Sequence, residues 1–205
     1  MSKIEECAFE LSYIKKEYEI SKGEIIASKR VNLGQLLGKT HPVDADFIVP
    51  IPETAIHYAQ GYAHETNTPL CHAIFKKKPK QRTLFLPHRT EVIKDVFAFM
   101  PKFFENKKIV LIDETIISGL SLSTIINAIT EFKPKEIHLR LGCPPMSRKC
   151  PSNNFGDDWM YEGQKLFEND IFTSVEWLSV DQLSSFAKCS YCFGGLDDYS
   201  KLVEY

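Results

Sequence analysis

The chain has 205 residues, with 25 basic and 27 acidic side chains and a formal net charge of −2. This length suits one domain with a single core, and the balanced charge argues against binding to nucleic acid or a membrane surface. The N-terminal sequence has no signal-peptide core, and no stretch approaches the roughly 20 apolar residues of a membrane span. We therefore expect a cytoplasmic protein that binds neither nucleic acid nor membrane.

Hydrophobic periodicity predicts helices and strands in alternation along the chain. The predicted elements are a helix at 24–38, a strand at 45–52, a helix at 54–67, a strand at 108–113, a helix at 121–132 and a strand at 136–145. This alternation indicates an α/β fold, a parallel sheet flanked by helices on both faces. Such sheets bind ligands beyond the C-terminal ends of their strands.

The stretch "VPIPETA" (49–55) ends the first predicted strand. Its two prolines restrict the backbone, so the N–H groups of Glu53, Thr54 and Ala55 can face an anionic group. An ordinary helix N-terminus explains the same pattern.

The segment "FKKKPKQRTLFLPHR" (75–89) carries six lysine and arginine side chains between predicted elements. A long basic loop is often only solvated surface. Beside anion-binding turns, the same loop suits a cationic lid that closes over a substrate, with Lys76, Lys78 and Arg82 among its cations.

Two acids and a Ser-Gly turn follow the second predicted strand, in "KIVLIDETIISGLS" (108–121). Asp113 and Glu114 stand at the strand end, where carboxylates can bind sugar hydroxyls or, through water, Mg²⁺. Gly119 permits a tight turn, and N–H groups at the helix start suit a phosphate group, helped by the hydroxyls of Ser118 and Ser121. A strand-to-helix turn capped by serine has the same sequence.

Six cysteines in a cytoplasmic chain indicate buried thiols, metal ligands or reactive thiols rather than disulfides. Cys189 and Cys192 form a Cys-x-x-Cys pair, which alone fits zinc binding, redox chemistry or chance. Cys71 and Cys143 lie in apolar, strand-like contexts and are predicted to be core thiols.

The segment "IVLIDETIISGLS" (109–121) resembles the phosphoribosyl diphosphate (PRPP) signature of type I phosphoribosyltransferases, an apolar strand followed by two acids and a Gly-x-Ser loop. Further segments, in the same order, resemble the phosphoribosyltransferase domain of the amidophosphoribosyltransferase family. They are "CAFELSYI", "HPVDADFIVPIPET", "GYAHETNTPL", "FKKKPKQRTLFLP", "KEIHLRLGCPPM" and "CSYCFGG". The resemblance covers most of the chain.

This resemblance implies one phosphoribosyltransferase-like domain over residues 1–205, in which 1–20 and 146–205 form a cysteine-containing appendage. In the family, the loop after the two acids holds the 5-phosphate, the turn after the first strand holds the diphosphate with Mg²⁺, and an amine displaces the diphosphate.

The resemblance also implies the roles of single residues. Asp113 and Glu114 would hold the ribose hydroxyls and, directly or through water, Mg²⁺, and Arg82 would act with them in catalysis. The substrate-binding residues would be Pro52, Glu53, Thr54, Lys76, Lys78, Thr115, Ser118, Gly119, Leu120 and Ser121.

Four cysteines fall at the positions that ligate a four-iron, four-sulfur (4Fe-4S) cluster in one subclass of the family: Cys7, Cys150, Cys189 and Cys192. The resemblance therefore implies a 4Fe-4S cluster. Zinc is the alternative, because four thiolates suit either centre.

Several residues depart from the family pattern. Glu114 stands where the second acid is usually Asp, Ala55 stands where Gly is usual, and Leu120 stands where a hydroxyl residue is usual. Ser2 follows Met1, whereas the family's glutaminase domain begins with a cysteine nucleophile. We therefore expect ammonia or another small amine as acceptor, or a separate glutaminase subunit as partner, in a homo-oligomer. The alternatives are a non-catalytic sensor of nucleotides or PRPP, and an iron-sulfur redox sensor.

Overall fold

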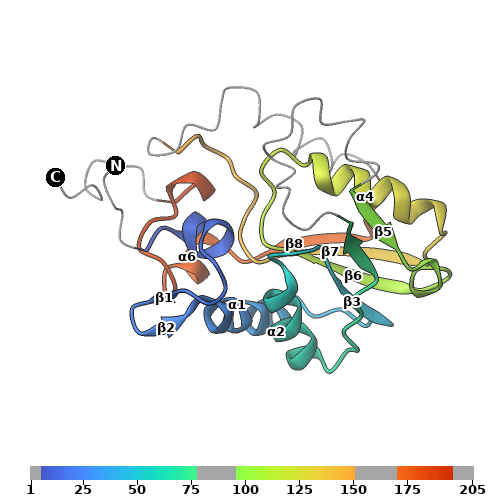
Figure 1. Ribbon diagram of the computed structural model, residues 1–205, viewed down its shortest axis with the longest axis horizontal. Coiled ribbons are helices and arrows are strands. Elements are labelled where there is room, and N and C mark those ends of the chain that lie inside the picture. The colour runs from blue at the N-terminus through green and yellow to red at the C-terminus, as the bar shows by residue number, and fades with distance from the viewer. Residues whose placement is uncertain (1–5, 78–95, 151–169, 196–205) are drawn as a thin grey trace.

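The computed structural model describes residues 6–77, 96–150 and 170–195 (Figure 1). Its centre is a parallel sheet of four strands in the order β3-β6-β7-β8. These strands are β3 (Phe47–Pro50), β6 (Lys108–Asp113), β7 (Glu136–Leu141) and β8 (Ser174–Trp177). Because β6 is an inner strand, its C-terminal end is flanked by the ends of β3 and β7.

Helices cover both faces of this sheet (Figure 1). α1 (Ile26–Thr40) and α2 (Ile56–Thr66) lie on one face, and α4 (Leu120–Glu131) lies on the other. β6 is apolar along most of its length because both of its faces are buried. Val110 packs in the core that includes α1 and α2, whereas its neighbour Leu111 packs in the core that includes α4.

Smaller elements surround the sheet. They are the π-helical turn η1 (Glu10–Ile14), the strands β1 (Ile20–Ser21) and β2 (Glu24–Ile25), the strands β4 (Ile74–Lys76) and β5 (Phe97–Phe99), the 3-10 turns η3 (Pro101–Phe103) and η5 (Tyr191–Phe193), and the helix α6 (Val180–Leu183). β1 pairs with β2, and β4 pairs with β5, each as an antiparallel ribbon. In the sequence, β4 precedes residues 78–95 and β5 follows them. No helix in the described ranges combines the length and apolar character needed to cross a membrane.

The predicted α/β fold is confirmed, and each of the six predicted elements is present, the strand at 108–113 with the predicted bounds and the other five with shifted bounds. The strand predicted at 45–52 is reduced to β3. The strand predicted at 136–145 ends at Leu141, and beyond it the N–H groups of Gly142 and Cys143 donate to the carbonyls of Asp113 and Glu114.

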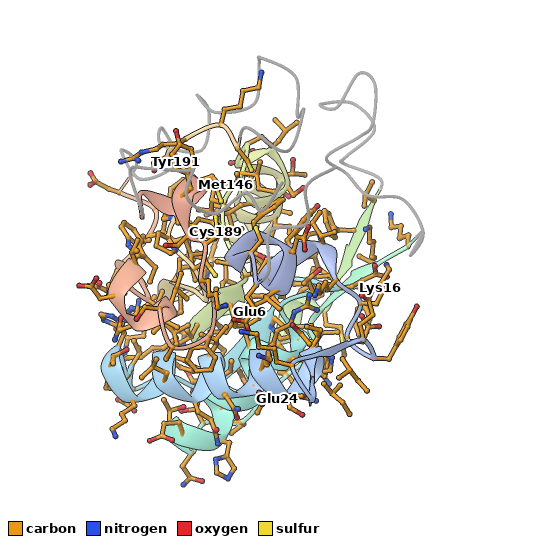
Figure 2. The ribbon with its side chains drawn as sticks, turned by 90° about the vertical axis from the view of Figure 1, so that its left-hand side faces the viewer. Glu6, Lys16, Glu24, Met146, Cys189 and Tyr191 are labelled. Carbon is orange, nitrogen blue, oxygen red and sulfur yellow. The ribbon has the colours of Figure 1, made fainter. Side chains whose placement is uncertain are left out.

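The first and last described segments lie side by side at one end of the molecule, where Figure 2 labels Met146, Cys189 and Tyr191. The N–H of Ala8 donates to the carbonyl of Cys189 over 2.8 Å, and Cys7 pairs with Cys189 as an isolated parallel bridge. These contacts tie the two distant parts of the sequence together.

The appendage predicted at 1–20 and 146–205 is described only in part. β8 comes from this range but belongs to the central sheet. The division of the chain into a domain and an appendage therefore stays a prediction.

Glycines let α1 and α2 approach closely. A Cβ atom added to Gly34 would lie 2.0 Å from the carbonyl oxygen of Tyr58, and one added to Gly61 would lie 2.0 Å from the carbonyl oxygen of Val31. No side chain fits at such a distance from a neighbouring backbone. The two helices therefore form one tight layer behind β3 and β6.

Gly34→Ala is expected to lower the free energy of unfolding by about 1–3 kcal/mol, the usual cost of overpacking a core. The added methyl group forces the two helices apart, and this outweighs the better helix propensity of alanine. Urea unfolding measures the change. Lys39→Ala, at an exposed position of the same helix, is the control and should change stability by less than about 0.5 kcal/mol. Equal effects of the two substitutions would contradict the close crossing.

Candidate active site

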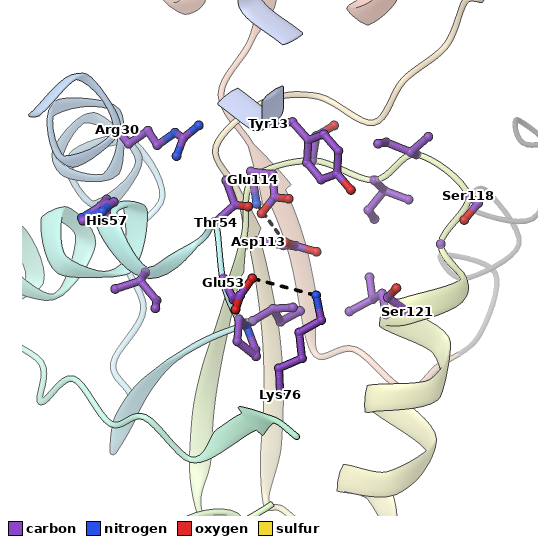
Figure 3. Close-up of a pocket in the computed structure, with 18 of the residues that line it drawn as sticks. Tyr13, Arg30, Glu53, Thr54, His57, Lys76, Asp113, Glu114, Ser118 and Ser121 are labelled. Carbon is purple, nitrogen blue, oxygen red and sulfur yellow. Dashed lines mark hydrogen bonds and ion pairs between the residues drawn. The ribbon is translucent and has the colours of Figure 1, made fainter. Parts of the chain in front are cut away.

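A pocket of about 630 Å³ opens where β3 and β6 end (Figure 3). Parallel α/β sheets bind ligands at this edge. The sequence-predicted site residues that line it are Pro52, Glu53, Thr54, Lys76, Asp113, Glu114, Thr115, Ser118, Gly119, Leu120 and Ser121. Two more, Lys78 and Arg82, lie outside the described residues.

Asp113 and Glu114 form an acid pair in this pocket. The N–H of Glu114 donates to Oδ1 of Asp113 over 3.0 Å, and Glu114 is 7% exposed. Burial raises the pKa of Asp113 well above its usual range, and the neighbouring Glu114 carboxylate raises it further. Burial also raises the pKa of Glu114, while the positive charges of Arg30 and Lys76 act in the opposite direction. A ligand that brings hydroxyl donors or a cation would favour the ionised pair.

The loop after the acid pair ends at Gly119, whose φ of 73° is left-handed. This turn starts α4, whose first N–H groups have no acceptor within the helix. The hydroxyl of Ser118 accepts a hydrogen bond from the N–H of Leu120 over 3.5 Å. Thr115 instead donates to the carbonyl of Pro144 over 2.7 Å, which ties the loop to the scaffold. The loop and the positive end of α4 suit a phosphate group.

The turn after β3 brings Pro52, Glu53 and Thr54 to the pocket, and the peptide bond between Pro52 and Glu53 is cis. Lys76 reaches the same place from β4, with its Nζ 4.0 Å from Oε2 of Glu53 (Figure 3). The turn and the β4-β5 ribbon therefore meet beside the acid pair.

A further wall of the pocket comes from the N-terminal segment, and the sequence did not predict it. Tyr13, Lys15, Lys16 and Glu17 line the pocket, together with Arg30 of α1. The available signal was a pair of cations, Lys29 and Arg30, on the buried face of α1. We call Tyr13 and residues 15–17 the N-terminal wall.

The four cysteines predicted as metal ligands are all buried: Cys7, Cys150, Cys189 and Cys192. A hydrogen bond from Cys7 lowers the pKa of the Cys189 thiol to about 6. Burial raises the pKa of Cys192, and the nearby Cys150 and Cys189 raise it further. Four buried, neighbouring thiols suit an iron-sulfur cluster or zinc. In the described part of the chain, however, no group of three or more His, Cys, Asp or Glu side chains is arranged to hold a metal ion.

The other two cysteines were predicted to be core thiols. Cys143 is 1% exposed and burial raises its pKa to about 12, so this prediction is confirmed. Cys71 is only half-buried, because it lies in the segment before β4 at the margin of the core.

Curated proteins similar to this chain are amidophosphoribosyltransferases. That of Methanocaldococcus jannaschii is 31% identical over 147 residues, which are 70% of this chain and 31% of the relative. That of Methanothermobacter thermautotrophicus is 33% identical over 147 residues, which again are 70% of this chain and 31% of the relative. The chain is a relative of the amidophosphoribosyltransferases. It spans about a third of the length of these two relatives, and no protein-family model matches it.

The amidophosphoribosyltransferase of a Synechocystis strain is 26% identical over an alignment of 214 positions. This alignment covers 92% of this chain and 41% of the relative. Among solved structures, glutamine PRPP amidotransferase from B. subtilis, complexed with ADP and GMP, has a TM-score of 0.78 at 22% identity. The match covers 93% of this chain and 46% of that structure. The predicted phosphoribosyltransferase fold is thereby confirmed.

Proposed function

We propose that this relative of the amidophosphoribosyltransferases displaces diphosphate from PRPP with ammonia or another small amine. The observation that carries the proposal is the convergence of two anion-binding turns and an acid pair on one pocket. PRPP has matching chemistry, because its ribose carries a phosphate at one end and a diphosphate at the other.

Each part of the pocket takes one part of the substrate in this proposal. Asp113 and Glu114 accept hydrogen bonds from the ribose hydroxyls. The loop from Thr115 to Ser121 binds the 5-phosphate with its N–H groups. The turn at Pro52, Glu53 and Thr54 lies beside the diphosphate, whose charge is met by Lys76.

The reaction needs no nucleophile from the protein. The bond from C1 of the ribose to the diphosphate oxygen breaks, the amine nitrogen bonds to C1, and the nitrogen then loses a proton. C1 becomes cation-like as the bond weakens, while negative charge grows on the diphosphate. Lys76 stabilises that charge, as would Lys78 and Arg82 of the predicted lid, and closure would exclude water as a competing nucleophile.

The carboxylates of Glu53, Asp113 and Glu114 also fit Mg²⁺, which prefers oxygen ligands and retains several waters. When bound, Mg²⁺ would neutralise charge on the leaving diphosphate. The three acids are therefore proposed to hold the cation directly or through water.

We also propose that Cys7, Cys150, Cys189 and Cys192 hold a 4Fe-4S cluster. Their burial and mutual contacts support one shared centre at the junction of the two terminal segments. These cysteines do not line the substrate pocket, so the cluster has a structural role. A cytoplasmic homo-oligomer and a separate glutaminase subunit remain predictions.

PRPP with Mg²⁺ is expected to stabilise the protein by about 2.7 kcal/mol when the ligand is present at 100 times its dissociation constant. The reason is that only the folded chain brings the two anion sites and the acid pair together. Thermal unfolding with PRPP, with and without Mg²⁺, measures the gain. An unchanged unfolding temperature at millimolar PRPP and Mg²⁺ would refute the proposed substrate.

Ammonium salts are expected to support diphosphate release by the 205-residue chain, whereas glutamine is not. The chain matches about a third of the length of the two archaeal relatives, and the pocket proposed for PRPP is the part of the reaction that this match can account for. The rate should rise with pH, because unprotonated ammonia is the nucleophile. Turnover with glutamine by the purified chain alone would overturn this expectation, and turnover after adding a second protein would identify a glutaminase partner.

A non-catalytic sensor of nucleotides or PRPP is the second candidate. Leu120, an apolar residue that lines the phosphate loop, and the buried Ala55 at the start of α2 favour it. A sensor would bind PRPP or a nucleotide without releasing diphosphate. An iron-sulfur redox sensor is the remaining alternative, and it would respond to oxidation of the cysteine centre without consuming PRPP.

A further inference from the structure

Arg30 is a buried cation on the inner face of α1, and it is 2% exposed. It takes part in none of the salt bridges found among the described residues. A buried charge is costly unless hydrogen bonds and nearby opposite charge compensate it. The groups that compensate Arg30 therefore indicate what it does.

Two backbone carbonyls accept hydrogen bonds from the guanidinium. Nε donates to the carbonyl of Leu11 over 3.0 Å, and Nη2 donates to the carbonyl of Lys15 over 2.7 Å. These carbonyls lie at opposite ends of η1. Because the guanidinium is planar and rigid, both bonds form only when η1 has one position on α1.

The position of η1 sets the N-terminal wall of the pocket. Tyr13 lies within η1, and residues 15–17 follow it directly. Figure 3 shows Tyr13 above the acid pair, with the side chain of Arg30 directed toward the pocket from α1. A shift of η1 would therefore move the wall relative to Asp113 and Glu114.

Arg30 also lines the same pocket as Asp113 and Glu114. One side chain thus donates hydrogen bonds to the segment that forms the N-terminal wall and borders the pocket that holds the acid pair.

We propose that Arg30 is a positioning residue that holds the N-terminal wall at a fixed place relative to the acid pair. It donates to η1 and lines the same pocket as Glu114, and it acts through the position of the wall. The identity of the ligand rests on the proposed function, whereas the positioning of η1 does not.

Three variants test this role. Arg30→Met retains an apolar stem but donates no hydrogen bond. Arg30→Lys retains the charge, but its single nitrogen has to replace two nitrogens that reach separate carbonyls. Lys29→Met is the control, because Lys29 is the adjacent cation on α1, is 8% exposed and lies outside the pocket lining.

The first measurement is amide hydrogen exchange of the ligand-free protein over residues 10–17, which include the N–H of Lys15 bonded to the carbonyl of Glu10 at 2.8 Å. Both Arg30 variants should exchange about tenfold faster or more in this segment, the effect of losing a hydrogen bond to a charged group. Lys29→Met should exchange there as the wild type does.

The second measurement is the affinity for PRPP with Mg²⁺ by calorimetry. Arg30→Met should bind about tenfold more weakly or worse. Arg30→Lys should recover part of the affinity through its charge, but residues 10–17 should still exchange faster than in the wild type.

Wild-type protection of residues 10–17 in either Arg30 variant would overturn the proposal. So would faster exchange spread evenly over α1, α2 and the sheet, which a general loss of stability produces. If Arg30→Met does not fold, Arg30→Lys decides the question by the same criteria. If the wild type binds no PRPP, the proposed function fails, and the exchange data alone still decide the role of Arg30.

Discussion

Asp113→Asn is expected to stabilise the free protein at neutral pH and to weaken PRPP binding by about 10- to 100-fold. Burial and the adjacent Glu114 raise the pKa of Asp113 in the folded state. A carboxyl group with a raised folded pKa loses stability as pH rises from its unfolded pKa, about 4, through the folded value. Asparagine removes this loss, and its oxygen can still accept the N–H of Glu114. Binding weakens because a ribose hydroxyl or Mg²⁺ loses a charged partner.

Denaturant unfolding from pH 5 to 8, together with calorimetry of PRPP binding, measures both effects. Asp46→Asn is the matched control. The pKa of Asp46 is lowered by a hydrogen bond from the N–H of Lys108, so neutralising this exposed carboxylate should destabilise slightly and leave binding unchanged. If Asp113→Asn bound PRPP as tightly as the wild type, the sugar would not lie at the acid pair.

Cys189→Ser is expected to remove the metal centre and to destabilise the protein by more than about 4 kcal/mol, because loss of a metal ligand belongs to the most damaging classes of substitution. Wild-type protein purified without oxygen should be brown and contain about four irons and four sulfides per chain, as a 4Fe-4S cluster requires. The variant should be colourless. Hydrogen exchange should rise first where residues 6–8 contact residues 188 and 189, since these backbone contacts surround Cys189.

Cys71→Ser is the control for this effect. Cys71 is half-buried beside β4, away from the other cysteines, so its variant should retain the colour and nearly all the stability. Colourless wild-type protein with one zinc per chain would show that the four cysteines bind zinc and not a cluster. If the wild-type protein contained no metal and was only as stable as Cys189→Ser, these cysteines would not form a metal site.

The sequence predicts the sheet edge and its loops well, for local reasons. The run from Ile109 to Ile112 is apolar enough to be an inner parallel strand, and Asp113 and Glu114, directly after this run, line the pocket. Gly119 predicts a tight turn because glycine adopts the left-handed backbone without steric cost, and α4 begins directly after it. Each of these features depends on neighbouring residues alone.

Features that depend on distant contacts were missed. β8 is a short edge strand with half its residues exposed, so it lacks the apolar run that predicted β6. The N-terminal wall reaches the pocket only because Arg30 bonds two carbonyls that lie 19 and 15 residues before it in the chain. Nothing in the local pattern of residues 13–17 encodes that contact, and the buried cations Lys29 and Arg30 of α1 were its one sign.

We propose that this pocket breaks the bond between ribose and diphosphate in PRPP. Release of diphosphate by the purified chain, measured with PRPP, Mg²⁺ and an ammonium salt at alkaline pH, tests it most directly. We expect steady release that requires the amine and falls sharply in Asp113→Asn. Tight binding of PRPP without release of diphosphate, for ammonia and for a panel of small amines, would contradict it and would favour the sensor.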